Sequence, residues 1–302
     1  MTITPRYLQA NDKVAIVSTA RKITMEEITP AINLFKSWNL DVVVGDTIGL
    51  EYNQEAGTDK QRAQDLQRFL DDDTIKAIFC ARGGYGTVRI LNLINFNDFI
   101  YCPKWIVGYS DVTALLSHLY FNYNIEAIHG IMPINITDNK DNVAVNSLKD
   151  ILFNNKNEII FNANSLNRKG RSSGEIIGGN LSVLYSLMGS NSFVDTDGKI
   201  LFIEDLDEYL YHIDRMMMAL KRAGKLSNLK GLIVGQMSDM HDNTISFGKT
   251  AEEIVFDAVK DYDYPVCFNA PIGHIGENNH AIVYGRETII DVSCEKVIVS
   301  QK

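Results

Sequence analysis

The first half of this 302-residue chain alternates short apolar segments with segments of helical periodicity. The apolar segments are nearly continuous hydrophobic runs, which is typical of parallel strands that are covered by helices on both faces. We expect strands at residues 13–19, 41–44, 75–81, 105–107 and 125–128, with helices at 26–38, at 59–70 and after 110. Repeated strand–helix units of this kind predict a doubly wound α/β domain.

The composition changes near residue 160, where a polar stretch rich in Asn, Ser and basic residues is typical of a linker or a crossing segment. Beyond it we expect helices at 181–188, 209–221 and 250–262, strands at 200–204 and 232–235, and a final hairpin, ETIIDV–SCE–KVIVS. The chain is therefore predicted to be α/β with two domains. They are an N-terminal doubly wound parallel-sheet domain (1–155), a linker (156–175) and a smaller, β-rich α/β C-terminal domain (176–302).

Charge and cysteine content exclude several classes of protein. A net charge of −9 disfavours a protein whose main task is to hold a nucleic-acid backbone or an anionic membrane. The cysteines form no CxxC pair, so no metal or redox motif is indicated: Cys80, Cys102, Cys267 and Cys294. The N-terminus lacks the pattern of a signal peptide, and no apolar run approaches the roughly 20 residues that cross a bilayer. We expect a cytoplasmic protein without nucleic-acid or membrane partners.

A serine stands where an expected strand meets a helix, in the segment KWIVGYSDVTALLSHLYF. A hydroxyl on such a turn projects at the carboxyl edge of a parallel sheet, where the next backbone N–H can stabilise an oxyanion. Ser110 is therefore a candidate nucleophile, although the segment lacks the second glycine of G-x-S-x-G. The alternative is that Ser110 and Asp111 only cap the helix, which is the commoner role of such a pair.

A second strand-to-helix turn, CARGGYGTVRIL, is rich in glycine. Gly83, Gly84 and Gly86 let backbone N–H groups approach an anion or a carbonyl group closely. Arg82 is a candidate ligand for a substrate carboxylate. The alternative is that the glycines allow close packing and that Arg82 forms a salt bridge within its domain. The turn is similar to the GGDGT loop of phosphofructokinases and NAD kinases, but Tyr85 replaces the acid that those enzymes need near magnesium.

An acid and an imidazole stand at the ends of later expected strands. Glu204 terminates the apolar run KILFIE, at the edge where sites gather in open α/β sheets. His274 lies in the glycine-flanked loop PIGHIG, and His129, at the end of IEAIH, is its rival as a base. Ser110, Glu204 and His274 follow the order of a triad in which the imidazole takes the hydroxyl proton and the carboxylate orients the imidazole.

Seven motifs between residues 82 and 274 resemble those of the LD-carboxypeptidase family of serine peptidases, also called muramoyl-tetrapeptide carboxypeptidases. The microcin C self-immunity hydrolases are their relatives. The motifs read RGGYG, GYSD, HG, GGNL, ED, YHIDR and PIGH. The resemblance implies Ser110 as nucleophile, His274 as general base and Glu204 as its orienting acid. It also implies an oxyanion hole from the N–H groups of Gly84 and Asp111, a homodimer, and neither metal nor cofactor.

The resemblance further implies the substrate: the L,D-peptide bond that holds the terminal D-alanine of a cytoplasmic murein tetrapeptide, cut during peptidoglycan recycling. Two departures concern the shape of the pocket. The chain has His129-Gly130-Ile131 where the family commonly has His-Gly-Pro, and it lacks the proline that the family often has before Gly285.

Two alternatives stay open. One is a serine hydrolase of peptidyl-nucleotide antibiotics, which an aromatic stacking loop would favour. The two tryptophans, Trp38 and Trp105, both belong to the N-terminal domain, so this alternative ranks second. The other is a non-catalytic or nucleotide-binding α/β protein. No Walker-type lysine follows the glycine turn, and no acid stands in it for magnesium, which disfavours this alternative.

Overall fold

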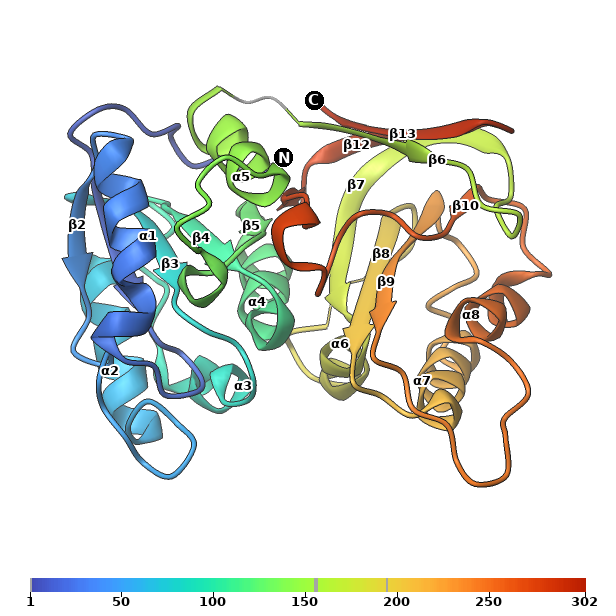
Figure 1. Ribbon diagram of the computed structural model, residues 1–302, viewed down its shortest axis with the longest axis horizontal. Helices are drawn as coiled ribbons and strands as arrows, with labels where there is room; N and C mark the ends of the chain where they lie inside the picture. Colours follow the sequence, from blue (N-terminus) through green and yellow to red (C-terminus); the bar gives the residue numbers. More distant parts are fainter. Residues whose placement is uncertain (1, 155–156, 194) are drawn as a thin grey trace.

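The computed structural model describes residues 2–154, 157–193 and 195–302. Figure 1 shows two halves side by side, each built on its own sheet. In the described residues the first half holds a six-stranded sheet of order β11-β5-β4-β3-β1-β2. The second half holds a seven-stranded sheet of order β10-β9-β8-β7-β12-β13-β6.

The first sheet is parallel except at one edge. Its strands are β1 (Lys13–Val17), β2 (Asp41–Val44), β3 (Ile75–Cys80), β4 (Trp105–Gly108), β5 (Ala127–His129) and the antiparallel β11 (Ile282–Tyr284). Helices α1 (Met25–Ser37) and α5 (Val143–Asn154) pack on one face, and α2 (Asp59–Asp71), α3 (Thr87–Ile90) and α4 (Thr113–Tyr123) on the other. Successive strand residues alternate between these two apolar layers, since side chains along a strand point to opposite faces.

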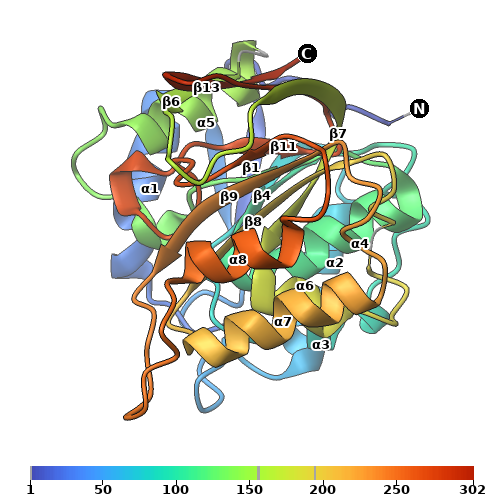
Figure 2. The same cartoon turned by 90° about the vertical axis from the view of Figure 1, so that its right-hand side faces the viewer.

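The second sheet joins a parallel part to an antiparallel part through one long strand. Its strands are β6 (Glu158–Asn162), β7 (Gly170–Asn180), β8 (Ile200–Leu206), β9 (Gly231–Ser238), β10 (Val266–Cys267), β12 (Glu287–Val292) and β13 (Lys296–Gln301). The first half of β7 pairs antiparallel with β12, and its second half pairs parallel with β8. Helices α6 (Leu181–Leu187), α7 (Leu210–Arg222) and α8 (Ala251–Val259) lie on one side of the parallel strands (Figure 2).

Local sequence explains where several of these elements begin. Helices α1, α2 and α8 each start with a capping box, in which a threonine and a Glu or Gln three residues later satisfy each other's backbone N–H. These pairs are Thr24 and Glu27, Thr58 and Gln61, and Thr250 and Glu253. Single 3₁₀ turns lie at Leu91–Leu93, Ser110–Val112, Pro133–Asn135 and Gly276–Asn278.

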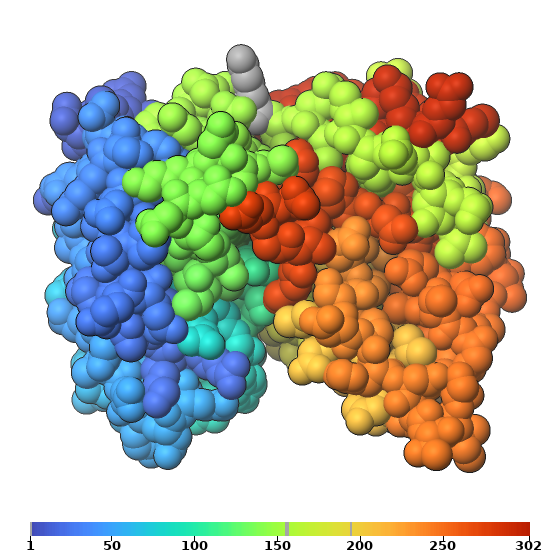
Figure 3. Space-filling model, viewed as in Figure 1, coloured from blue at the N-terminus to red at the C-terminus, as the bar shows by residue number. Residues whose placement is uncertain are grey.

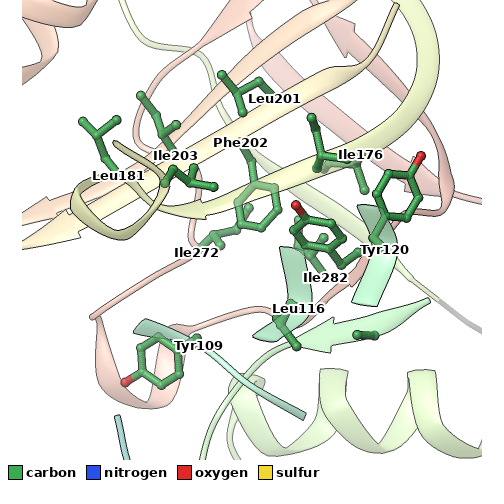
Figure 4. Packing of buried hydrophobic residues seen from close by; sticks show 14 of the residues in the cluster. Tyr109, Leu116, Tyr120, Ile176, Leu181, Leu201, Phe202, Ile203, Ile272 and Ile282 are labelled. Carbon is green, nitrogen blue, oxygen red and sulfur yellow. The ribbon is translucent and has the colours of Figure 1, made fainter. Parts of the chain in front are cut away.

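One apolar core runs through both halves. Leu116 and Tyr120 of α4 belong to the same buried cluster as Ile176 and Phe202 of the second sheet. Figure 4 shows these side chains close together, with Ile282 of β11 among them. A buried ion pair also joins the halves, because Arg286 Nη2 donates to Glu126 Oε2 at 2.6 Å, with both side chains at most 5% exposed. The two halves therefore share one continuous interior.

The fold class predicted from the sequence is confirmed: the chain is α/β, with two domains. Each expected strand and helix is present, shifted by a few residues at its ends, and β12 and β13 form the expected hairpin. Within the segment expected to be a linker, residues 158–162 form β6 and residues 170–175 belong to β7, while residues 155 and 156 lie outside the described residues. Strand β11 of the first sheet comes from the C-terminal range 176–302.

Several sulfur-containing side chains lie in the interior. Cys80 and Cys267 are buried free thiols. Met216 and Met217 of α7 are buried, whereas Met218 is exposed. Within the described residues, no helix has the length and apolar character that crossing a bilayer requires.

Candidate active site

Ser110 sits on a strained turn at the carboxyl end of β4. Tyr109 is extended, and Ser110 has φ of 61°, in the left-handed region that non-glycine residues rarely adopt. Ser110 does not cap a helix through its side chain in the described residues, so the capping alternative is wrong for this hydroxyl. Asp111 does cap, but for a different helix: its Oδ2 accepts from the N–H of Thr87, at the start of α3, at 2.8 Å. The turn therefore leaves the hydroxyl of Ser110 half-buried and uncommitted.

The glycine-rich turn after β3 lies against this serine. A Cβ atom on Gly83 would stand 3.1 Å from Ser110 Oγ, so only a glycine leaves this approach open. Gly84 has φ of 106° and packs on the side chain of Arg21. Among the residues that the structure describes, the N–H groups of Gly84 and Asp111 donate no hydrogen bond. The turn and the start of the 3₁₀ segment thus bring two uncommitted backbone donors to the neighbourhood of Ser110.

Glu204 and His274 form a buried carboxylate–imidazole pair. Glu204, near the end of β8, is wholly buried, and its Oε2 lies 2.7 Å from Nδ1 of His274. A carboxylate can only accept, so the pair assigns the proton to Nδ1 and leaves Nε2 as the basic nitrogen of the neutral ring. Gly273 makes the approach possible, because a Cβ there would lie 2.7 Å from Glu204 Oε2. Asn279 and Ser238 hold the loop through hydrogen bonds to the N–H of Gly273 and the carbonyl of His274.

The environment of His274 shifts its proton affinity in two directions. Burial disfavours the imidazolium, but the hydrogen bond and the charge of Glu204, with a further contribution from Asp205, raise the pKa of His274 above its ordinary value. The side chain is 14% exposed, so one part of the ring reaches the surface. The structure thus holds an imidazole that is oriented by a buried carboxylate and partly accessible from outside.

Ser110 and His274 come from different domains and meet through Tyr109. The ring of Tyr109 packs on the ring of His274 with 4.8 Å between centroids, and Ser110 is the next residue. In the described residues no hydrogen bond joins Ser110 Oγ to His274. Catalytic hydrogen bonds are often loose until substrate binds. The hydroxyl–imidazole bond therefore stays a prediction, whereas the acid–imidazole half of the arrangement is present.

Arg82 is turned toward its own domain. Its Nη1 donates to the carbonyl oxygen of Lys22 at 3.3 Å and lies 3.7 Å from Glu27 Oε1. These are the contacts that the structural alternative expects. They are partly exposed and weak, since an exposed ion pair contributes about 0–1 kcal/mol. A role for Arg82 in carboxylate binding stays a prediction.

His129, the rival base, lies inside the protein. It is wholly buried, and the rings of Phe202 and Tyr109 pack on it at 5.0 and 5.8 Å between centroids. Burial lowers the pKa of His129 to about 4, with the nearby charges of Glu204 and His274 acting in opposite directions. Glu204 pairs with His274 and not with His129. His129 is thus a neutral imidazole behind the pair.

Sequence reasoning missed the residues that support the pair from the other face of β8. The carboxylate of Asp205 accepts from Nδ2 of Asn180 at 2.9 Å and from the N–H of Ser182, in α6, at 2.8 Å. The N–H of Asn180 in turn donates to Oγ1 of Thr113 in α4, at 3.1 Å. Burial and the charge of Glu204 raise the pKa of Asp205 to about 7. The period-2 alternation of a strand, which turns Asp205 away from Glu204, is the signal that could have found this link.

Figure 3 shows a notch between the blue-to-cyan residues of the first domain and the yellow-to-orange residues of the second, on the side toward which β8 and β9 run in Figure 1. A serine on a strained strand-to-helix turn and a buried acid–imidazole pair, held by adjoining domains, are the features that define two-domain serine hydrolases.

Sequence comparison supports the same class. The chain matches the model of the LD-carboxypeptidase N-terminal domain over residues 14–130 and that of the C-terminal domain over residues 173–290. The chain therefore belongs to the LD-carboxypeptidase family, a family of serine-type peptide hydrolases.

Individual relatives agree with this assignment. The chain is 32% identical to a probable murein peptide carboxypeptidase of Bacillus subtilis over 276 residues, which is 89% of this chain and 86% of the relative. It is 25% identical to the murein tetrapeptide carboxypeptidase of Pseudomonas aeruginosa over 290 residues, 92% of this chain and 93% of the relative.

Solved structures share the fold. The muramoyltetrapeptide carboxypeptidase of Oxalobacter formigenes superposes with a TM-score of 0.86 at 21% identity, over 96% of this chain and 98% of that one. The microcin C7 self-immunity protein MccF does so with a TM-score of 0.88 at 20% identity, over 99% and 98%.

Proposed function

We propose that this enzyme is an LD-carboxypeptidase that releases the terminal D-alanine from murein tetrapeptides. The observation that carries the proposal is the Glu204–His274 pair, 2.7 Å apart, beside the strained turn of Ser110. The relatives whose names specify murein peptides cover about nine tenths of the chain and support this substrate.

In the proposed reaction Ser110 Oγ attacks the carbonyl carbon of the bond before D-alanine, and Nε2 of His274 takes its proton. Glu204 stabilises the imidazolium, and the N–H groups of Gly84 and Asp111 donate to the oxyanion of the tetrahedral intermediate. The intermediate collapses when His274 gives the proton to the leaving amine, which releases D-alanine. A water molecule, deprotonated by His274, then hydrolyses the acyl-enzyme and restores Ser110.

The peptidyl-nucleotide alternative has less support in the described residues. The two tryptophans do not offer the stacking surface that would favour it, because Trp105 is wholly buried and Trp38 nearly so, both in the core of the first domain. The likeness to MccF concerns the fold. A peptidyl-nucleotide is therefore the comparison substrate in the experiment below.

The test is mass spectrometry of murein tetrapeptide incubated with the wild-type protein, with Ser110→Ala and with Ser186→Ala. Ser186 is an exposed serine of α6 that bonds only its own helix, so it is the matched control. We expect the wild type and Ser186→Ala to release D-alanine, and Ser110→Ala to lose the activity by several orders of magnitude. Cleavage of the peptidyl-nucleotide alone, or near-full activity of Ser110→Ala, would contradict the proposal.

We further infer that the enzyme is a homodimer that acts on muropeptides in the cytoplasm. The family resemblance supports the dimer, and a net charge of −9 supports the absence of a nucleic-acid partner. Light scattering at the protein concentration of the assay tests the oligomeric state, and fractionation of cells tests the location.

A further inference from the structure

Two buried polar groups close to the candidate active site have unused hydrogen-bonding capacity. Oε1 of Glu204 and both ring nitrogens of His129 are shielded from solvent and have no hydrogen-bond partner among the described protein atoms. Buried polar atoms in native proteins nearly always have a partner, in the protein or in an ordered water molecule. Leaving a buried acceptor or donor unpaired costs about 1–3 kcal/mol, and more when the group is charged. We therefore expect both groups to have a hydrogen-bond partner inside the protein, such as an ordered water molecule.

The two groups face each other across the domain interface, His129 from β5 and Glu204 from β8. Phe202 and Glu204 are two residues apart on β8, so their side chains point to the same face of the strand. The ring of His129 packs on Phe202 at 5.0 Å between centroids. Tyr109, whose ring contacts His129 at 5.8 Å, also contacts His274 at 4.8 Å. His129 is thus surrounded by residues that adjoin the Glu204–His274 pair.

The chemistry of the two groups is complementary. Oε2 of Glu204 is occupied by Nδ1 of His274, so the unpaired oxygen is the second acceptor of the same carboxylate. His129 is kept neutral by burial, which lowers its pKa to about 4 and leaves the ring with one N–H donor and one acceptor nitrogen. A neutral donor adds no competing charge next to His274. The groups do not bond directly, and one water molecule that accepts from the imidazole N–H and donates to the carboxylate would pair the donor nitrogen of His129 with Oε1 of Glu204.

We propose that His129 is a positioning residue for the hydrolysis, which donates through one bound water molecule to Oε1 of Glu204. In this arrangement the carboxylate is held from both sides, by His274 on one oxygen and by the His129-bound water on the other. Holding the carboxylate in this way fixes the direction in which it presents Oε2, and hence the direction of the Nε2 of His274. It also stabilises the carboxylate charge, which moderates the attraction that Glu204 exerts on the imidazolium.

The titratable groups around His129 are few, and each has a defined place. Glu204 comes from β8, His274 from the loop after β10, and Tyr109 from the turn that carries Ser110. Tyr109 donates its hydroxyl proton to Asn135 at 3.2 Å, and burial raises its pKa far above the physiological range. A change at His129 should therefore register first in the ionisation of the Glu204–His274 pair.

The test compares His129→Phe, which keeps a ring and removes the donor, with His129→Gln, which restores an N–H donor. His118→Phe is the matched control, because His118 is also a buried histidine but bonds Ser192 of another segment. The pKa of His274 is measured by ¹⁵N NMR of the imidazole ring in the free protein, without substrate. The pH profile of kcat/KM is measured with murein tetrapeptide as the substrate, and both its acid limb and its plateau are compared.

We expect His129→Phe to raise the pKa of His274, because Glu204 loses its other donor and binds the imidazolium more strongly. We expect kcat/KM on the plateau to fall about tenfold, the lower end of the range for the loss of one hydrogen bond to a charged group. His129→Gln should recover most of both changes, and His118→Phe should cause neither. A high-resolution crystal structure of the wild type should show a water molecule within hydrogen-bonding distance of His129 and Oε1 of Glu204.

Unchanged ionisation of His274 in a folded His129→Phe protein would overturn the proposal, as would a wild-type structure without that water. If His129→Phe does not fold, the crystal structure and His129→Gln still decide. The kinetic part of this proposal rests on the proposed function, because it uses murein tetrapeptide as the substrate. The NMR part is independent of it, because the pKa of His274 is measured in the free protein. If His129→Phe raises the pKa of His274 as expected but the wild type leaves murein tetrapeptide intact, the result would contradict the proposed function and not the role of His129.

Discussion

Glu204→Gln isolates the contribution of the buried acid to the base. Glutamine keeps the length and nearly the volume of the side chain, so the packing against Gly235 and Gly273 is preserved. The variant removes the negative charge that lies 2.7 Å from Nδ1 of His274. It also allows the amide to present its NH₂ group to Nδ1, which would move the ring proton to Nε2, the nitrogen that must accept the proton of Ser110.

The size of the effect follows from these two losses. A hydrogen bond to a charged group contributes about 1.5–3 kcal/mol, so losing the charge alone reduces kcat roughly 10- to 150-fold. The wrong tautomer adds to this, and the comparable substitution in serine-protease triads reduces kcat about 10⁴-fold. KM should change little, because Glu204 is wholly buried and does not reach a substrate.

The pH dependence has a definite sign. In the wild type Glu204 raises the pKa of His274, and the base must be neutral to act, so activity falls as the pH drops through that raised value. In Glu204→Gln burial is left as the largest influence and lowers the pKa of His274, so the acid limb of kcat/KM moves to lower pH. The raised pKa also stabilises the folded wild type below the ordinary pKa of histidine, and this contribution is lost as the pH rises through the raised value.

The assay is a pH profile of D-alanine release by the wild type, by Glu204→Gln and by Glu208→Gln. Glu208 also pairs with a histidine, His212, on a neighbouring helix, so its variant controls for the loss of a carboxylate–imidazole pair elsewhere. Thermal unfolding verifies that each variant is folded. A folded Glu204→Gln enzyme with kcat within threefold or so of the wild type, or with an unmoved acid limb, would refute the assignment of Glu204 as the orienting acid.

Three further changes test other parts of the structure. Gly83→Ala should reduce kcat/KM about 100-fold without unfolding the protein, because the added methyl group would stand 3.1 Å from Ser110 Oγ; normal kinetics would contradict the proposed position of the nucleophile. Arg82→Met should spare a C-terminally amidated substrate and weaken cleavage of the free acid if Arg82 binds the carboxylate, whereas equal effects on both would show that it acts through its contacts with Glu27. Arg286→Met should lower the free energy of unfolding by about 3–5 kcal/mol, because the carboxylate of Glu126 would lose its ion pair inside the protein. Denaturant titration of Arg286→Met, Glu126→Gln and the double variant measures the coupling energy between the two residues.

The fold was predictable because its strands and helices repeat strong local patterns. Apolar runs such as residues 75–80 and capping boxes such as Thr58 with Gln61 fix element type and position without help from distant residues. The edges of the sheets were not predictable in this way. Strand β11 joins the first sheet although it lies about 150 residues beyond its partner β5, and no local pattern encodes such a pairing.

In the candidate site, too, local sequence patterns predicted some features, whereas contacts between distant residues determine others. Ser110, Glu204 and His274 were selected because each ends an expected strand or lies in a glycine-flanked loop, and the structure brings the last two into contact. The direction in which Arg82 points depends on Glu27 and Lys22, which are distant in sequence. Likewise, complete burial of His129 arises from Phe202 of the other domain, so sequence reasoning could only name it as a rival base.

The pairing of β11 with β5 has a consequence for how the enzyme is made. Until residues 282–284 have left the ribosome, the edge of β5 that ends in His129 has no neighbour, and the loop that carries His274 has only just been synthesised. The proposed nucleophile, Ser110, is therefore translated long before the proposed base, His274. In the proposed mechanism, a nascent chain that has not yet reached residues 274–284 therefore lacks both the proposed base and the strand that completes the first sheet.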